Sequence, residues 1–185
     1  MTVTIAIDPG SRITGIAILH GSRAWSMLMK AQTTAEISGF LEECVVKFGS
    51  FVLVLEDQHL VEHGEKDSNG RGKVNWPSIV ALVAARVRWQ TVAEMLGIKV
   101  RLANASAWQA KMHAGVPKLG PGGKKHGRKQ RSKLAVQAIW LDVPRITGPA
   151  EVGAGTATSR PSSKATNDEA DALCIGRWAS LYGEP

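Results

Sequence analysis

Near its start the chain reads Ile5-Ala6-Ile7-Asp8-Pro9-Gly10-Ser11-Arg12-Ile13-Thr14-Gly15-Ile16-Ala17-Ile18, and the rest of the sequence is best interpreted outward from this stretch. Short β-branched apolar runs flank the Pro-Gly pair, which predicts two strands joined by a turn. Asp8 stands at the end of the first run. An Asp in such a place is costly to bury as an anion unless a metal, a cation or hydrogen-bond donors stabilise its charge. The alternative is a structural Asp that starts a Pro-Gly turn and caps a backbone N–H.

The order Asp-Pro-Gly-Ser-Arg-x-Thr-Gly at 8–15 resembles the first hairpin of the RuvC family of Holliday-junction resolvases. In that family the Asp is the central ligand of a magnesium site on an RNase H-like fold. Actin-like kinases and ATPases also start with a hairpin that carries Asp-x-Gly, so the motif alone leaves both families open. A length of 185 residues predicts one domain and is too short for the two-domain actin-like architecture.

The composition favours an anionic partner and a reducing compartment. The formal net charge is +7 and the pI about 9.7, and nucleic acid is the commonest partner of such a protein. Cys44 and Cys174 stand at apolar positions of predicted helices, without metal-ligand spacing to another Cys. The sequence has neither a signal-peptide pattern nor an apolar run of transmembrane length. We therefore expect a soluble, cytoplasmic protein.

Apolar periodicity predicts strands and helices in alternation after the hairpin. A third strand is expected over 24–29, and Thr33 with Glu36 forms a capping box for a helix that ends at Gly49. The continuous apolar run 51–55 is typical of a central parallel strand. A further short strand is expected over 98–102, followed by a short helix that opens with Ser106-Ala107-Trp108-Gln109.

The longest predicted helix spans 76–96, with Asn75 as N-cap, Pro77 in its first turn and Gly97 after its end. Its apolar residues cover more than one face, which indicates burial on several sides. One face is expected to pack on the sheet and a second on a partner subunit. A helix buried on all sides within a monomer is the alternative.

A second carboxylate, Glu56, directly follows the 51–55 strand. Ligands of open α/β sheets bind at the carboxyl ends of such strands. The RuvC family likewise has a catalytic Glu at the end of its fourth strand, often followed two residues later by Gln, and Glu56 and Gln58 match this spacing. Alternation points Asp57 to the opposite face.

The residues after Gln58 contain a second motif, His59-Leu60-Val61-Glu62-His63, which matches a zinc-protease pattern. That chemistry needs both His on one helix face, and the Gly64 and polar residues that follow favour a loop instead. In RuvC-like enzymes an aromatic side chain just past the Glu wedges into the junction. This chain has His59 and Leu60 at that place.

Between Met95 and Leu141 the chain has ten Lys or Arg and no Asp or Glu. A basic run is often only a solvated face, but one free of acids, in a chain with sixteen elsewhere, is better explained by phosphates. Its Gly-rich middle predicts a flexible segment over about 114–130, and Lys133 resembles the start of the next helix in the RuvC family. The candidate DNA-binding residues are Arg12, Lys118, Lys124, Lys125, Arg128, Lys129, Arg131 and Lys133.

The chain ends with a loop over about 144–164 and a last helix with three acids. Asp168 and Asp171 share a helix face, and the RuvC family ends with the same Asp-x-x-Asp-Ala-Leu order. Thr166 and Glu169 have capping-box spacing, which gives Glu169 a structural role. The resemblance therefore implies four catalytic, metal-binding carboxylates: Asp8, Glu56, Asp168 and Asp171.

The resemblance to the RuvC family implies a single α/β domain over 1–185, with an RNase H-like fold and a central mixed five-stranded sheet flanked by helices. Oxygen-only ligands with a charge of −4 suit two Mg²⁺ ions, which Mn²⁺ could replace, and imply phosphodiester hydrolysis with metals roughly 4 Å apart. The implied partner is a four-way DNA junction, which a homodimer resolves by paired symmetric nicks.

Three alternatives remain at this point. The first is an RNase H-like nuclease for other branched DNA or for structured RNA. The second is a catalytically inactive DNA-binding module, which the complete acidic set disfavours. The third is an actin-like phosphotransferase, which the chain length disfavours.

Overall fold

The structure is a computed structural model and describes residues 2–30, 33–57, 65–66, 72–73, 76–123, 125–154 and 161–182. Five strands form one mixed sheet in the order β3-β2-β1-β4-β7. The first three are antiparallel neighbours, and β4 and β7 run parallel to β1. These strands are β1 (Val3–Asp8), β2 (Ile13–His20), β3 (Arg23–Lys30), β4 (Phe51–Asp57) and β7 (Lys99–Asn104). The expected mixed five-stranded sheet is confirmed. A separate pair consists of β5 (Glu65–Lys66) and β6 (Gly72–Lys73).

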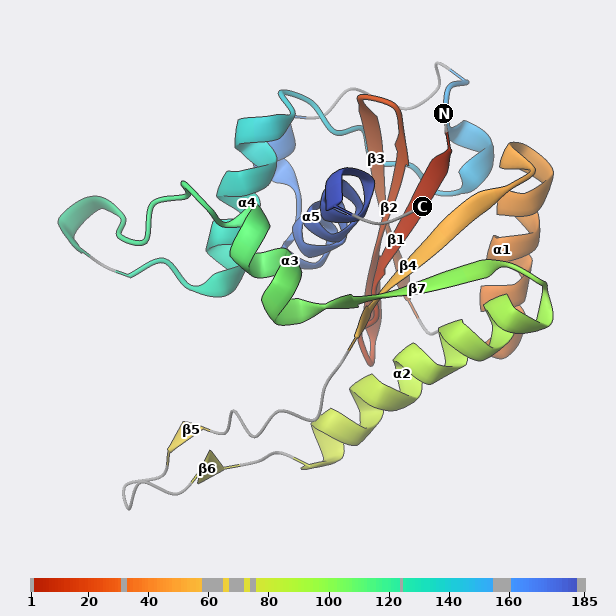
Figure 1. The fold of residues 1–185 in the computed structure, drawn as a ribbon, viewed down its shortest axis with the longest axis horizontal. Helices are drawn as coiled ribbons and strands as arrows, with labels where there is room; N and C mark the ends of the chain where they lie inside the picture. The colour runs from red at the N-terminus through yellow and green to blue at the C-terminus, as the bar shows by residue number, and fades with distance from the viewer. Residues whose placement is uncertain are drawn as a thin grey trace.

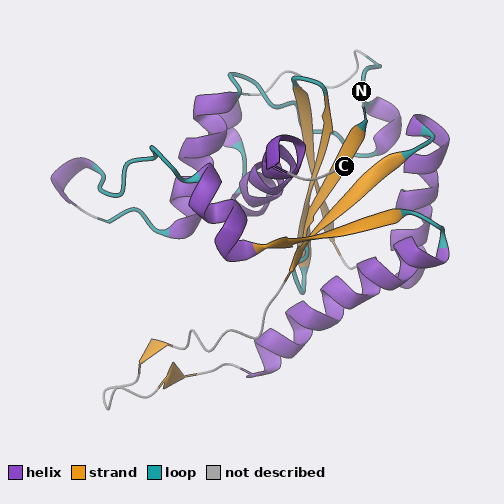
Figure 2. Ribbon diagram, viewed as in Figure 1, coloured by secondary structure: helices purple, strands orange, loops and turns teal. Residues whose placement is uncertain are grey.

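Helices cover both faces of the sheet (Figures 1 and 2). One face packs against α1 and α2, and the other against α5, with α3 and α4 beside it. The helices are α1 (Thr34–Phe48), α2 (Trp76–Met95), α3 (Ala105–Met112), α4 (Arg128–Ile139) and α5 (Asn167–Tyr182). Among the described helices, none is long and apolar enough to cross a membrane.

Strand alternation decides which side chains meet which helices. Ile5 and Ile7 belong to the core on the α1–α2 side, and Ala6 and Val54 belong to the core on the α5 side. Residues two positions further along the same strands therefore also face α5. The alternation thus assigns the side chains at the ends of β1 and β4 to the α5 side of the sheet.

Several predicted boundaries are confirmed. The Thr33–Glu36 capping box is present, with the Thr33 N–H donating to Glu36 Oε2 at 2.7 Å and the Glu36 N–H donating to Thr33 Oγ1 at 3.2 Å. Gly49 and Gly97 end α1 and α2 with φ of +68°. Cys44 and Cys174 are buried free thiols whose pKa burial raises.

One prediction on the basic half of the chain needs correction. The helix expected at Lys133 begins at Arg128, because the residues 128–131 are all good helix formers that follow directly on Gly127. The flexible segment expected over about 114–130 stays a prediction; within it the His126 N–H donates to the Lys118 carbonyl at 2.9 Å. Basic residues of this stretch are therefore held on defined elements.

The segment expected as a loop over 144–164 partly extends the sheet. Ser26 of β3 donates its N–H to the Pro144 carbonyl at 3.0 Å, and its carbonyl accepts from the Ile146 N–H at 2.9 Å. Ile146 and Val152 are buried in the core. The edge of the sheet at β3 is thus covered by a parallel bridge.

Some expectations fall on residues outside the described ranges. They are Asn75 as an N-cap, Gln58, the wedge position at His59 and Leu60, the zinc-protease pattern at 59–63, and Lys124.

Candidate active site

Asp8 and Glu56 stand next to each other where two parallel strands end. Ile7 of β1 is in register with Leu55 of β4, so the residues that follow are neighbours on the α5 face. Glu56 is buried, Asp8 is partly buried, and each carboxyl group influences the pKa of the other. The carboxyl ends of β1, β4 and β7 converge at this end of the sheet (Figure 1).

Gly15 brings the first turn of α5 against these strands. It pairs with Asp8 across β1 and β2, and a Cβ at Gly15 would lie 2.0 Å from the backbone oxygen of Asp168. Only glycine leaves room for such an approach. Asp168 and Asp171, one turn apart on α5, are consequently placed beside Asp8.

The four carboxylates interact electrostatically. Burial raises the pKa of Asp8 well above its usual value, and the charges of Glu56, Asp171 and Asp168 raise it further. Burial also raises the pKa values of Glu56 and Asp171. In the described part of the chain, no three Asp, Glu, His or Cys side chains are placed to hold a metal ion as they stand. The structure therefore groups the predicted carboxylates without closing them around one point.

Lys129 of α4 provides positive charge to this cluster. Its ammonium group lies 3.0 Å from Asp168 Oδ1. Burial lowers the Lys129 pKa, but the hydrogen bond to Asp168 and the charges of Asp168, Asp8 and Asp171 outweigh this and raise it. Lys129 is thus placed at the carboxylates, where it forms an ion pair with Asp168.

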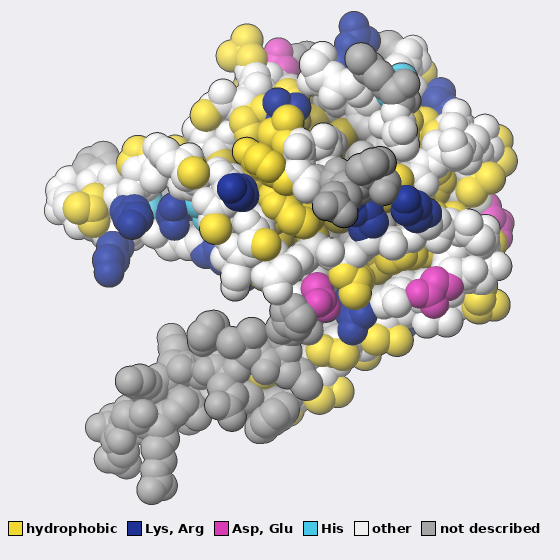
Figure 3. Space-filling view, in the orientation of Figure 1, with side chains coloured by type: hydrophobic (Ala, Val, Ile, Leu, Met, Phe, Trp, Pro, Cys, Tyr) yellow, Lys and Arg dark blue, Asp and Glu magenta, His cyan; other side chains and the backbone are white. Residues whose placement is uncertain are grey.

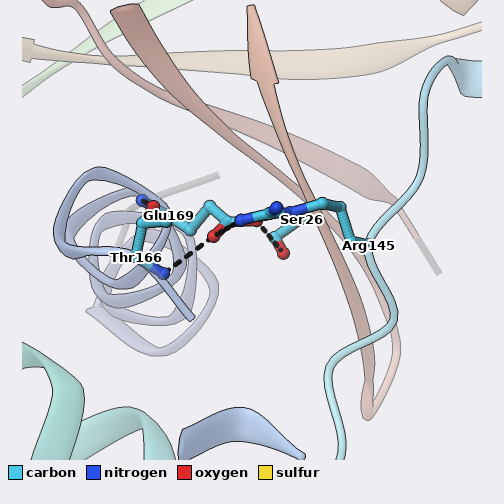
Figure 4. Close-up of polar contacts among 4 residues, drawn as sticks. All are labelled: Ser26, Arg145, Thr166 and Glu169. Carbon is cyan, nitrogen blue, oxygen red and sulfur yellow. Dashed lines mark hydrogen bonds and ion pairs between the residues drawn. The ribbon is translucent and has the colours of Figure 1, made fainter. Parts of the chain in front are cut away.

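Glu169 has the structural role that its spacing predicts (Figure 4). The Thr166 N–H donates to Glu169 Oε2 at 2.8 Å, and the Glu169 N–H donates to Thr166 Oγ1 at 3.3 Å. The carboxylate is fully buried and also accepts from Ser26 Oγ at 3.0 Å and from Arg145 Nε and Nη2 at 2.7 and 2.5 Å. It therefore ties the start of α5 to β3 and to the segment that covers it.

Sequence reasoning missed four side chains that support the site. They are Arg145, Trp108, His113 and Ser132. Trp108 donates its indole N–H to Glu56 Oε1 at 3.1 Å, and His113 Nε2 lies 3.0 Å from Ser132 Oγ. The Ser132 hydroxyl also lowers the pKa of Asp171. The one sequence signal was Trp108, a large aromatic residue in a short helix directly after a predicted strand.

The basic residues border the cluster on the α3–α4 side. A pocket of about 550 Å³ is lined by Lys118, Arg128 and Arg131, and its described lining contains no Asp or Glu. Gln109 also lines it, and Gln109 Nε2 and Arg131 Nε are buried without a hydrogen-bond partner among the described residues. Figure 3 shows Lys and Arg side chains gathered on the lobe formed by the segment between α3 and α4. The other described candidates lie outside this pocket: Arg12 and Lys125 are exposed, and Lys133 is half-buried on α4.

No family model matches the chain, and no curated protein matches it either. Solved structures do. Thermus thermophilus RuvC in complex with a Holliday junction substrate matches with a TM-score of 0.56 at 17% identity, over 99% of this chain and 98% of that chain. A second Thermus thermophilus RuvC structure matches with a TM-score of 0.51 at 19% identity, over 98% and 95%.

The yeast mitochondrial Holliday junction resolvase Ydc2 also matches, with a TM-score of 0.51 at 12% identity, over 98% of this chain and 82% of that chain. At these identities the likeness establishes the architecture. The α/β, RNase H-like fold predicted from the sequence is confirmed, and this chain shares it with RuvC over nearly its whole length.

Proposed function

We propose that this protein is a metal-dependent endonuclease that resolves four-way DNA junctions by paired symmetric nicks. The observation that carries the proposal is the grouping of Asp8, Glu56, Asp168 and Asp171 at one end of the sheet, with raised pKa values for Asp8, Glu56 and Asp171. Strongly perturbed carboxylates beside a basic pocket are the expected marks of such a site. The solved structures with this fold include a RuvC bound to a Holliday junction substrate, which supports the choice of DNA.

The donor set fits hard divalent cations. All four side chains offer carboxylate oxygens, which suit Mg²⁺ and Mn²⁺. Asp171 Oδ1 is buried and has no hydrogen-bond partner among the described residues, so one oxygen remains for a cation. We assign two Mg²⁺ ions, with Mn²⁺ as substitute, to Asp8, Glu56, Asp168 and Asp171. When bound, such ions supply an activated water and a stabilised leaving oxygen for phosphodiester hydrolysis.

The residues of the basic pocket hold the DNA backbone in this proposal. Lys118, Arg128 and Arg131 present cationic donors in a lining without carboxylates, and the buried Gln109 Nε2 adds a neutral donor. Phosphate oxygens satisfy donors of this kind, and such contacts fix position without reading sequence. Arg128 also lowers the pKa values of Glu56 and Asp171, so it stands between the pocket and the carboxylates.

Paired nicking requires two sites, and α2 supports a homodimer. Trp89, Val92 and Ala93 of this helix are buried in the core, whereas Val80 and Met95 are 59% and 79% exposed. The helix therefore keeps apolar surface after packing on the sheet, which is available to a second copy. A C2 dimer would match the near two-fold symmetry of a four-way junction.

A cleavage assay with Mg²⁺ on four-way, forked, flap and linear DNA, and on structured RNA, tests the proposal. Symmetric, religatable nicks on the four-way substrate alone are expected, and Asp8→Asn should abolish them. Equal cleavage of flaps, forks or structured RNA would assign the chain to the alternative, a structure-selective nuclease. Junction binding without cleavage under Mg²⁺ or Mn²⁺ would instead identify a DNA-binding module.

A further inference from the structure

Trp108 contacts the carboxylate cluster from its protein side. The side chain is fully buried on α3, and its indole N–H donates to Glu56 Oε1 at 3.1 Å. An indole nitrogen can only donate, so the direction of this bond is unambiguous. Because Glu56 is only 6% exposed, the bond forms out of water, where its electrostatic effect is strongest. It also lowers the Glu56 pKa against the larger effect of burial.

A second chain of contacts reaches Asp171. His113, 4% exposed, lies 3.0 Å from the fully buried Ser132 through Nε2 and Oγ. Burial and the charges of Arg131 and Arg128 lower the pKa of His113 to about 4, so the imidazole is neutral at pH 7. When Nε2–H donates to Ser132 Oγ, the Ser132 hydroxyl keeps its own proton, for which the Arg128 carbonyl lies at 3.4 Å, and the same hydroxyl lowers the pKa of Asp171.

These two supports form one packed unit. The rings of Trp108 and His113 meet edge to face, with centroids 5.6 Å apart and an interplanar angle of 78°. Asp168 has a different contact, the ammonium group of Lys129 at 3.0 Å. The unit adds hydrogen-bond donors to the cluster without adding charge. Asp171 still keeps one buried oxygen, Oδ1, free of described partners.

We propose that Trp108 and the His113–Ser132 pair are positioning residues that orient Glu56 and Asp171 toward a divalent cation. The inference rests on the metal-dependent function proposed above. Partners that hydrogen-bond a ligating carboxylate fix its orientation, and their loss typically costs about 10- to 100-fold in metal affinity. Trp108 and Ser132 are fully buried and lie outside the described lining of the basic pocket, so the expected effect of replacing either one is on metal binding rather than on DNA binding.

The first test observes Trp108 in the wild-type protein. The six tryptophans are labelled with ¹⁵N at the indole nitrogen, and the Trp108 signal is assigned with Trp108→Phe. Titration with Mg²⁺ should shift the Trp108 signal, because its acceptor becomes a metal ligand. Trp140 is the internal control, since its indole N–H donates to the Ser22 carbonyl at 3.1 Å, outside the cluster. Its signal should not move.

The second test measures Mn²⁺ affinity by electron paramagnetic resonance, with DNA affinity measured in EDTA. Trp108→Phe keeps an aromatic ring but removes the donor, and should weaken Mn²⁺ binding about 10- to 100-fold. Trp140→Phe should bind Mn²⁺ like the wild type, and neither variant should change DNA affinity. Ser132→Ala, a smaller change on a different element, should weaken Mn²⁺ binding in the same direction even where Trp108→Phe folds poorly.

The outcomes distinguish the proposed metal-dependent function from the positioning role of Trp108 and Ser132. Wild-type protein that neither binds Mn²⁺ nor cleaves DNA would overturn the proposed function and this inference with it. Wild-type protein that binds Mn²⁺ and cleaves, together with unchanged Mn²⁺ affinity in both Trp108→Phe and Ser132→Ala, would overturn the positioning role alone.

Discussion

Replacing Glu169 by Gln tests whether a buried helix cap contributes more to the unfolding free energy than an exposed one. The carboxylate is fully buried and accepts four hydrogen bonds, two from Arg145 and one each from Ser26 and Thr166. Gln has nearly the same shape but only one acceptor oxygen. At least two of the four donors would then lose their acceptor, and the new NH₂ group would face a donor.

The magnitude follows from these contacts. Hydrogen bonds to a charged group contribute about 1.5–3 kcal/mol each, so losing two costs about 3–6 kcal/mol. The Arg145 side chain is 42% exposed and can turn to water, which reduces the expected loss in unfolding free energy to about 2–3 kcal/mol. For a domain of this size, that corresponds to a fall in Tm of about 4–12 °C.

Urea unfolding followed by circular dichroism measures the loss, and the chain offers a matched control. Glu36 forms the same capping box with Thr33 on α1, but its side chain is exposed, and among the described residues its carboxylate accepts hydrogen bonds from Thr33 alone. Glu36→Gln should therefore cost clearly less than Glu169→Gln. Equal losses in the two variants would show that burial and the Arg145 contact contribute nothing, and would refute the reasoning.

Three further predictions concern the site. Asp171→Asn should abolish Mg²⁺-dependent cleavage in a gel assay while junction binding stays intact or tightens, whereas folded Glu169→Gln should retain most cleavage. Neutralising Lys118, Arg128 and Arg131 together should weaken junction binding and reduce its salt dependence by roughly 0.9 in log–log slope per lost phosphate contact; an unchanged slope would place the DNA elsewhere. Because burial raises the pKa values of Asp8, Glu56 and Asp171 above their unfolded values of about 4, these three carboxyl groups should contribute most to the stability of metal-free protein below that pH, and this contribution should be lost as pH rises through the raised values. Urea titrations across this range should show the loss in EDTA and its suppression by Mg²⁺.

The acidic cluster could be predicted because each carboxylate belongs to a local pattern. Asp8 and Glu56 end apolar strands, and strand ends of a parallel pair must meet at one edge of the sheet. Asp168 and Asp171 share a helix face by their spacing alone. The Thr166–Glu169 spacing likewise separated the structural acid from its neighbours, as the hydrogen bonds confirm.

The supporting residues could not be predicted because their contacts join distant segments. Trp108 and Glu56 are 52 positions apart, and Ser26 and Glu169 are 143 apart, so no local periodicity links them. Arg145 lies in a segment whose Gly, Pro, Ser and Thr content predicts only a loop. The start of α4 at Arg128 differs from the expected start at Lys133, which rests on the resemblance of the residues from Lys133 onward to a helix of the RuvC family.

The start of α5 combines two requirements that oppose each other. It must bring Asp168 and Asp171 close to Asp8, although like charges repel and burial raises the pKa of each buried carboxyl. Gly15 removes the steric barrier to this approach, and Glu169 fixes the same turn from the opposite side through Arg145 and β3. Because the residue that anchors the helix is not one of those that face the cluster, the anchor can be strong without altering the charge at the site. The packing at Gly15 and the capping by Glu169 thus hold the carboxylates close together. A bound cation then only has to compensate their negative charge.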